Sequence, residues 1–311
     1  MGTFWVVIIT LEAKKNLLTL RRKGIIFALL AIFPSFLIIS VISFYPLING
    51  LILSFTDYKL GQQTPAKWIG ISNYVSVFSS SIIWDSLGAT LYFALMVVTG
   101  VIVIGMALAL LLNRDFKGRA IARTLLIVPW AVPFFVSALL FRWLFDLQYG
   151  LVNYLLKSLF IIRANIGWLS QSPFFAMLSI SIAFIWRLYP FNMVTFLASL
   201  ETVDPVYYEV ASIDGANRVQ KFFHVTFPAI RNTFFTTVIL DIVWVFQEFT
   251  LVWIMTEGSL KTEVLSIFVY RNAFMSLTFP KAAVGGALYC ILLLVFAVIY
   301  IRLLLRIEGE E

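Results

Sequence analysis

Two carboxylates and an indole recur at helical spacing inside a strongly apolar part of the chain. Asp241, Trp244 and Glu248 stand at positions i, i+3 and i+7, which places them on one face of a helix, with Gln247 beside that face. Carboxylates accept hydrogen bonds from hydroxyl groups, and an aromatic ring packs on the apolar face of a ring-shaped ligand. The pattern therefore predicts contacts with a hydroxyl-rich ligand.

Further candidates lie on two neighbouring apolar segments. Arg187 and Phe191 share a helical face, and Ser137 is a smaller candidate. Ionisable residues in a membrane are costly and by default mark a pathway or a site. The alternative is interhelical packing, with Arg187 in a structural ion pair with Asp241 or Glu248. The sequence leaves open whether Arg187 forms such a pair or contacts a ligand.

The elements that must hold these side chains are transmembrane helices. Of the 311 residues, 61% are hydrophobic and 13% are charged, and the mean hydropathy is +0.95. One soluble core cannot bury that much apolar surface. Because a helix needs about 20 apolar residues to cross a bilayer, we predict an all-α polytopic membrane protein with six transmembrane helices: Ile25 to Leu47, Leu87 to Leu112, Thr124 to Phe145, Phe174 to Leu197, Phe234 to Ile254 and Ala282 to Leu305.

Lysine and arginine are distributed unequally between the two sides of this bundle. The two chain ends and the loops after the second and fourth segments carry 14 of them, and the remaining loops carry 7. Positive charge is retained in the cytoplasm, so both termini are predicted to be cytoplasmic in a cell-membrane protein. The net charge of +7 therefore reflects membrane orientation, and no separate basic domain indicates binding to nucleic acid.

The predicted organisation follows from these spans. Residues 1–24 form an N-terminal cytoplasmic or interfacial segment, in which the apolar run Phe4 to Leu11 is too short to cross a bilayer. A transmembrane domain occupies residues 25–305 and contains a cytoplasmic loop at 201–232. Residues 306–311 form a C-terminal tail.

Five prolines lie inside the predicted spans. Each removes a backbone donor and leaves a carbonyl one turn earlier without its partner. Kinked helices explain this pattern, and a cavity lined by broken helices is the alternative. The prolines are Pro34, Pro46, Pro129, Pro133 and Pro190.

A polar segment, EVASIDGANRVQKFFHVTFP, runs between the fourth and fifth spans from Glu209 to Pro228. Just before it, Asp204 and Pro205 predict the cap and first turn of a short helix. Gly215 permits a left-handed turn that ends this helix. Two short helices with a small-residue elbow can either dock a partner or pack as an amphipathic connector on their own bundle.

The second short helix is predicted to begin near Ala216 with Asp214 as its cap, and to end at Pro228. It carries an aromatic pair, Phe222 and Phe223, interleaved with basic residues. An aromatic knob on a rigid elbow can transmit motion between subunits.

The order Glu-x-Ala-x-x-Asp-Gly-Ala, followed by an aromatic pair and a proline, resembles the EAA loop in the membrane subunits of bacterial ABC importers. Five further segments resemble the carbohydrate branch, the maltose, trehalose and glycerol-phosphate type permeases. They are LSFTDY (53–58), WIGISNY (68–74), GMALALLLNRDFKGRAIARTLL (105–126), PWAVP (129–133) and RWLFDLQYGLVN (142–153). The resemblance extends over residues 24–305.

This resemblance implies a type I ABC importer permease fold and a subunit of an ATP-driven sugar importer. The implied partners are a second homologous permease subunit, two cytoplasmic ATPase subunits, an extracytoplasmic sugar-binding protein, membrane lipid and a di- or oligosaccharide. The ATPase-coupling residues it implies are Glu209, Ala211, Asp214, Gly215, Ala216, Phe222, Phe223 and Pro228. It also implies a substrate-pathway role for Asp241, Trp244 and Glu248 as a group. Together with the candidates from residue type and spacing, the predicted substrate pathway comprises Ser137, Arg187, Phe191, Asp241, Trp244 and Glu248.

The chain departs from the family pattern at three positions of the loop. Val210 replaces the usual alanine, Phe227 replaces the leucine before the proline, and Asn232 stands where a second proline is common. The larger side chains of Val210 and Phe227 change the details of the expected docking surface.

Several classes of site are excluded. The chain has no G-x-x-x-x-G-K-[ST] phosphate-binding motif, so we expect ATP hydrolysis by a partner rather than by this chain. The single cysteine, Cys290, and single histidine, His224, cannot form a disulfide within the chain or a Cys/His metal site. No cofactor is predicted, and no catalytic constellation supports a membrane-embedded enzyme.

Two transport alternatives remain open. A proton-coupled secondary transporter would use Asp241 and Glu248 as its proton relay. An importer for an anionic substrate such as glycerol phosphate would use Arg187.

Overall fold

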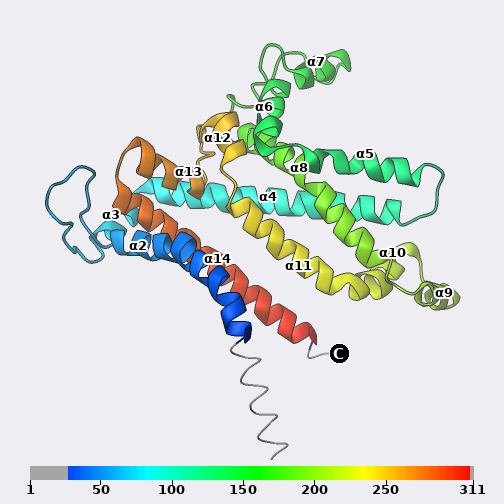
Figure 1. Cartoon of the computed structure of the whole chain (residues 1–311). Helices are drawn as coiled ribbons and strands as arrows, with labels where there is room; N and C mark the ends of the chain where they lie inside the picture. The colour runs from blue at the N-terminus through cyan, green and yellow to red at the C-terminus, as the bar shows by residue number, and fades with distance from the viewer. Residues whose placement is uncertain (1–26, 309–311) are drawn as a thin grey trace, which may run out of the picture. The chain divides into compact units, whose positions relative to one another are not determined.

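The computed structural model of the chain describes residues 27–308 (Figure 1). This part is helical, apart from loops and an isolated β-bridge between Thr56 and Trp68. It divides into two compact units between Leu53 and Ser54. The predicted segment 1–24 and residues 309–311 of the predicted tail lie outside the described residues.

The first unit contains one helical span, Phe27–Leu53. Residues 27–39 are α-helical, a π-helical turn η1 (Ser40–Phe44) follows, and α2 (Tyr45–Leu53) completes the span. The π turn ends two residues before Pro46. A proline ring clashes with the carbonyl four residues earlier in an α-helix, and the wider turn relieves this clash.

The second unit contains the remaining helices. They are α3 (Ser72–Phe78), α4 (Ser81–Leu112), α5 (Arg119–Ala131), α6 (Phe134–Leu144), α7 (Leu151–Ser158), α8 (Pro173–Leu200), α9 (Pro205–Ile213), α10 (Arg218–Lys221), η2 (Phe222–Thr226), α11 (Phe227–Phe246), α12 (Thr250–Thr256), α13 (Leu265–Tyr270), η3 (Arg271–Met275) and α14 (Phe279–Glu308).

Five helices of the described part are long and apolar enough to cross a membrane, and the bent pair α5–α6 makes up to six. This confirms an all-helical polytopic fold. The predicted third span, Thr124 to Phe145, is wrong as a single helix, because α5 and α6 meet at 96°. Val132 is extended at this break, with ψ 128°. The reason is Pro133, because proline disfavours the helical conformation of the preceding residue.

The predicted fifth span, Phe234 to Ile254, is wrong at both ends. A continuous helical segment runs from Arg218 to Phe246. Residues 247–249 then separate it from the short helix α12. Glu248 consequently lies beyond the end of the helix that carries Asp241.

Pro228 does not end the helix before it, contrary to the sequence prediction. It lies in the first turn of α11, directly after η2, in which Phe227 N–H donates to the Phe222 carbonyl. As before Pro46, the π turn ends two residues ahead of the proline and accommodates its ring. Pro190 likewise lies inside α8, which continues through it.

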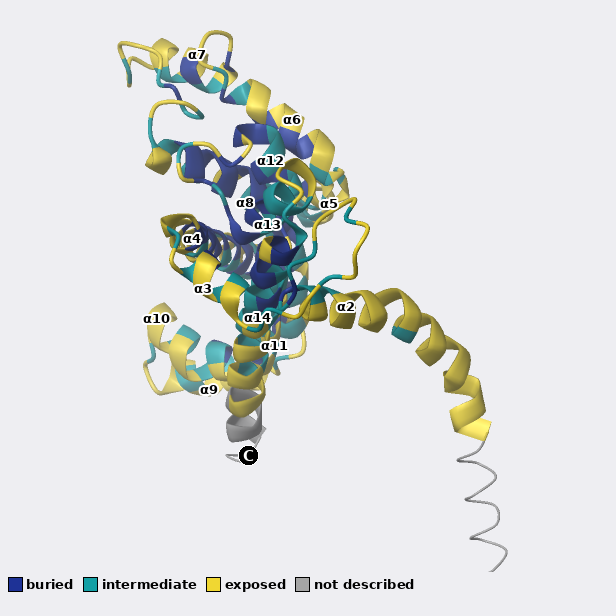
Figure 2. Ribbon diagram, turned by 90° about the vertical axis from the view of Figure 1, so that its left-hand side faces the viewer, coloured by how far each residue is buried: buried dark blue, intermediate teal, exposed yellow. Residues whose placement is uncertain are grey.

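The core forms where α4 and α8 pack together and α11 covers both (Figure 1). Gly105 allows the close approach of α4, because a Cβ there would lie 2.5 Å from Asn192 Cβ. Phe93 and Phe184 meet edge to face, with ring centroids 5.8 Å apart. Much of the buried ribbon in Figure 2 belongs to these helices and to α12. The closely packed α4–α8 pair therefore supports the two interrupted helical segments beside it, α5–α6 and α11–α12.

Candidate functional site

A cavity of about 370 Å³ lies between the α5–α6 break, α8 and the α11–α12 break. Because both breaks replace helix with irregular backbone, polar groups become available among the spans, which a membrane protein tolerates where the backbone lines a cavity. The cavity is lined by Trp130, Phe134, Arg187, Leu188, Trp244, Gln247, Glu248, Phe249 and Thr250.

Arg187 holds the first break from α8. Its Nε donates to the Val132 carbonyl at 3.1 Å, and its guanidinium carbon lies 3.5 Å from the centroid of the Phe134 ring. Within the described residues it forms no ion pair within 4.0 Å, so neither ion pair with Asp241 or Glu248 is present. The guanidinium thus compensates the carbonyl next to Pro133 and also lines the cavity.

Glu248 holds the second break. Its Oε1 accepts a hydrogen bond from Leu251 N–H at 2.6 Å, which satisfies a donor in the first turn of α12. The Glu248 carbonyl accepts from Ser266 Oγ at 2.6 Å. The carboxylate is therefore fixed in position at the cavity wall.

Aromatic rings form part of the cavity wall. Trp244 of α11 meets Phe191 of α8 at a centroid separation of 4.7 Å and an interplanar angle of 75°. Phe191 also lies 6.1 Å from the Trp130 ring. The predicted residues Arg187, Trp244 and Glu248 therefore converge, and Phe191 supports them from behind.

Asp241 and Ser137 do not line this cavity. Asp241 is fully buried and accepts a hydrogen bond from Asn192 Nδ2 at 3.0 Å. Ser137 is also buried, and its Oγ donates to the Pro133 carbonyl at 3.2 Å. The prediction that Asp241, Trp244 and Glu248 present one helical face is wrong because α11 ends at Phe246.

Six further lining residues are not among the predicted site residues, and of these the sequence indicated only Gln247, beside the predicted face. They are Trp130 and Phe134 from the first break, Leu188 of α8, and Gln247, Phe249 and Thr250 from the second break. The prolines around Trp130 signal the first break. The second break has no glycine or proline that would reveal it.

The elbow, residues 204–228, contains the predicted coupling residues. Asp204 caps α9 by accepting from Val206 N–H at 2.9 Å, and Pro205 opens the helix, as predicted. Gly215 has φ +76°, which confirms the left-handed turn. These features fix where α9 begins and where the chain turns between the two short helices.

The cap of the second short helix differs from the sequence prediction. Asn217, rather than Asp214, caps α10, and its Oδ1 accepts from Val219 N–H and Gln220 N–H at 3.0 Å each. Gln220 Oε1 accepts from the Asn217 N–H at 2.8 Å, which completes a capping box. Asp214 is instead the C-cap residue of α9.

The elbow combines internal bracing with exposed apolar side chains. The Tyr208 hydroxyl lies 3.1 Å from Thr226 Oγ1, which links α9 to η2. Ile213 is 85% exposed and Phe223 is 60% exposed. Phe222 instead packs partly against the bundle. A braced surface with exposed apolar side chains is suited to docking a partner.

Of the remaining predicted coupling residues, Glu209, Asp214 and Pro228 are exposed, and Ala211 and Ala216 are half-buried. Ala211, Asp214 and Ala216 line a shallow cleft of about 220 Å³ between α9 and α10. The structure therefore places most of the predicted set on one compact segment.

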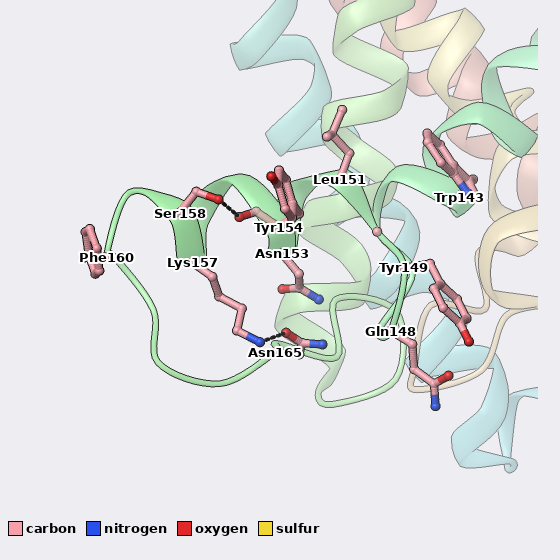
Figure 3. A pocket seen from close by; sticks show the side chains of 11 residues that line it. Trp143, Gln148, Tyr149, Leu151, Asn153, Tyr154, Lys157, Ser158, Phe160 and Asn165 are labelled. Carbon is pink, nitrogen blue, oxygen red and sulfur yellow. Dashed lines mark hydrogen bonds between the residues drawn. The ribbon is translucent and has the colours of Figure 1, made fainter.

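A larger hollow of about 660 Å³ lies over α7 and the loops beside it (Figure 3). Its polar groups are used within the loops, since Asn165 Nδ2 donates to the Leu147 carbonyl at 2.7 Å and Lys157 Nζ donates to Asn165 Oδ1 at 2.9 Å. Hydrogen bonds from the N–H groups of Tyr149 and Gln148 lower the pKa of the Asp146 carboxyl. These contacts show that the polar groups around the hollow stabilise the loops.

Among the described residues, no group of three or more His, Cys, Asp or Glu side chains could hold a metal ion. His224 is exposed, and its Nδ1 lies 2.9 Å from the Gln220 carbonyl.

Comparisons with known proteins identify close relatives along most of the chain. Residues 101–308 match the family described as binding-protein-dependent transport system inner membrane component. The inner membrane ABC transporter permease protein YcjO of Escherichia coli (strain K12) is 32% identical over 95% of this chain and 100% of its own length. The sulfoquinovosyl glycerol transport system permease protein SmoG of Agrobacterium fabrum is 31% identical over 82% of this chain and 83% of its own.

The fold is also that of a solved transporter. A chain in the crystal structure of a bacterial ABC transporter involved in the import of the acidic polysaccharide alginate aligns with a TM-score of 0.78 and 22% identity. The alignment covers 92% of this chain and 96% of that chain.

Proposed function

Because this chain belongs to the binding-protein-dependent ABC importer permeases of the carbohydrate-uptake type, we propose that it forms half of the pathway for a saccharide and couples to the ATPase through the elbow. Membership confirms the resemblance inferred from the sequence. The chain is a multi-pass inner-membrane permease subunit, and the ATPase is a separate partner. The proton-coupled alternative loses its support, because energy in this family comes from ATP.

The main support for the proposed pathway is the cavity between the two helix breaks. Its volume of about 370 Å³ falls in the ~300–1,000 Å³ range of small-molecule sites. Trp244 and Trp130 offer aromatic surface for the apolar faces of a sugar, and Glu248 and Gln247 offer hydrogen-bonding groups for its hydroxyls. Asp241 and Ser137 would support this site from behind.

The substrate proposal is tested by replacing Trp244 with alanine. Without the ring, the half-saturating saccharide concentration for uptake is expected to rise about tenfold, equivalent to ~1.4 kcal/mol. Uptake is measured in vesicles that contain the chain with its partner subunits and binding protein. A Trp68→Ala variant is the matched control, because Trp68 is an exposed loop indole outside the cavity. Equal half-saturation for Trp244→Ala and the control would contradict the proposed site.

The proposed arrangement places both termini and the elbow in the cytoplasm. The excess of lysine and arginine on that side supports it, as do the exposed Ile213 and Phe223 side chains. In the complete importer, a second permease would present a matching elbow, and each elbow would contact one of two ATPase subunits. An extracytoplasmic binding protein would deliver the saccharide from the other side.

Arg187 favours an anionic saccharide as a second candidate substrate. Its guanidinium lines the cavity and forms no ion pair within 4.0 Å among the described residues. Guanidinium groups bind carboxylate and phosphate in preference to neutral hydroxyls. Competition of a neutral disaccharide and a uronic-acid disaccharide for uptake distinguishes the two candidates.

A further inference from the structure

A polar pair is enclosed where α4, α8 and α11 meet. Asn192 and Asp241 are both fully buried, and Asn192 Nδ2 donates to Asp241 Oδ1 at 3.0 Å. Gly105 brings the backbone of α4 against Asn192, since a Cβ there would lie 2.5 Å from Asn192 Cβ. Three packed helices therefore surround the pair.

The pair lies at the boundary between two apolar clusters, both of which include residues of α4, α8 and α11. On each of these helices, one residue at the boundary lies between a member of the first cluster and a member of the second. Gly105 lies between Val101 and Met106, Asn192 between Leu188 and Met193, and Asp241 between Val245 and Ile230. A buried carboxylate in such surroundings requires a charged partner or several hydrogen-bond donors.

The charged side chains on α11 and on the helices packed against it do not supply such a partner. Asp85 of α4 pairs with Lys261, and Arg187 of α8 is bound to the Val132 carbonyl. Arg231 is ten residues from Asp241, about 15 Å along α11. Lys281 and Arg302 lie near the two ends of α14. Within the described residues, none of these groups forms an ion pair with Asp241.

One oxygen of each side chain lacks a hydrogen-bond partner. Asn192 Oδ1 and Asp241 Oδ2 are both buried without a hydrogen-bond partner. A protonated carboxyl donates one O–H, and an amide oxygen accepts it. A single proton on Asp241 Oδ2 therefore satisfies both atoms, whereas an ionised carboxylate leaves two acceptors unpaired in an apolar core, which is costly.

We propose that Asp241 carries its proton in this conformation and pairs with Asn192 as a neutral acid–amide clamp that positions the cavity wall. Asn192 directly follows Phe191, and Asp241 lies one turn before Trp244. The rings of Phe191 and Trp244 meet at 4.7 Å. Two hydrogen bonds between α8 and α11 thus fix this aromatic contact, and Asp241 acts as a positioning residue rather than a ligand of the saccharide.

Infrared difference spectroscopy tests the protonation directly. A protonated carboxyl has a C=O stretching band that a carboxylate lacks. In the full chain, purified with its partner subunits, subtraction of the Asp241→Asn spectrum from the wild type is expected to isolate this band. In Asn192→Leu the band should move to higher frequency, because both hydrogen bonds are lost. Absence of the band in the wild type, or an unmoved band in Asn192→Leu, would overturn the proposal.

Saccharide uptake tests the positioning role, and this readout alone rests on the proposed function. In Asp241→Asn the new amide can exchange two hydrogen bonds with Asn192, so the half-saturating concentration should stay within about twofold of wild type. Asp241→Leu removes both bonds and should raise it at least about fivefold or prevent assembly. Loss of uptake in an assembled Asp241→Asn complex would instead show a role for charge or proton transfer and overturn the clamp. If the wild type transports no saccharide, the proposed function fails, while the infrared band still decides the clamp.

Discussion

At the scale of single residues, two charged side chains in the cavity also stabilise the helix ends around it. Arg187 donates to the Val132 carbonyl at the α5–α6 break, and Glu248 accepts from Leu251 N–H at the start of α12. Exposed backbone polar groups are costly within a membrane, so a broken helix requires such partners. The same residues can therefore serve the fold and the substrate.

The two roles of Glu248 can be separated by substitution. Glu248→Gln keeps an oxygen that can accept from Leu251 N–H, so its thermal stability should match the wild type. Glu248→Leu removes the cap and should destabilise the chain by about 0.5–2 kcal/mol, the usual cost of losing a helix cap. Thermal unfolding of the two variants in detergent measures this difference. Equal stability of Glu248→Leu and Glu248→Gln would contradict the capping role.

At the scale of helices and loops, the sequence predicted several features that have a local cause. The cap at Asp204, the first-turn proline Pro205 and the turn at Gly215 follow from the residues present, whereas a helix broken at its prolines was only the alternative to a kinked third span. The break after Phe246 has no such local signal. The hydrogen-bond partners of Glu248 at this break are Leu251, three residues further along but in a separate helix, and Ser266, further along the chain.

Other contacts could not be predicted from the sequence, because they join residues that are far apart along the chain. The Asn192–Asp241 hydrogen bond joins residues 49 positions apart, and its geometry depends on how α8 and α11 pack. The long apolar helices and the family motifs could be recognised from the chain alone. The partners of the polar residues between the helices could not.

The π turn η2 gives a prediction about a helix and its register. Pro228 favours the wide turn, so Pro228→Ala allows the segment to revert to α-helix. Losing the extra residue of the π turn would rotate the elbow by about 100° relative to α11. Uptake should fall while thermal stability is kept or increased, because the variant regains a backbone donor. Uptake and the unfolding midpoint, measured on the same preparation, check this; undiminished uptake would show that this register is unimportant.

At the scale of the whole chain, the continuous helical segment Arg218–Phe246 connects the proposed coupling elbow with the proposed substrate cavity in the second unit. Its 29 residues span about 44 Å. The elbow lies at its beginning, where Figure 1 shows α9 and α10. Trp244, which lines the cavity, lies near its end. A stiff helix of this kind can carry a movement of the elbow to the cavity, which is what an ATP-driven permease requires.

The turn at Gly215 is the point at which this connection can be broken with least disturbance. A Cβ at Gly215 would meet no atom within 4 Å, so only its φ of +76° opposes substitution. A β-branched valine is strongly disfavoured there, whereas asparagine adopts left-handed conformations readily. Gly215→Asn is therefore the matched control for Gly215→Val.

ATP-driven saccharide uptake by these two variants, in vesicles with the partner subunits, decides whether the elbow drives the cavity. We expect Gly215→Val to insert and assemble but to lose uptake, with Gly215→Asn close to wild type. Wild-type uptake by Gly215→Val would rule out coupling through the elbow, because uptake would then continue with the elbow disrupted.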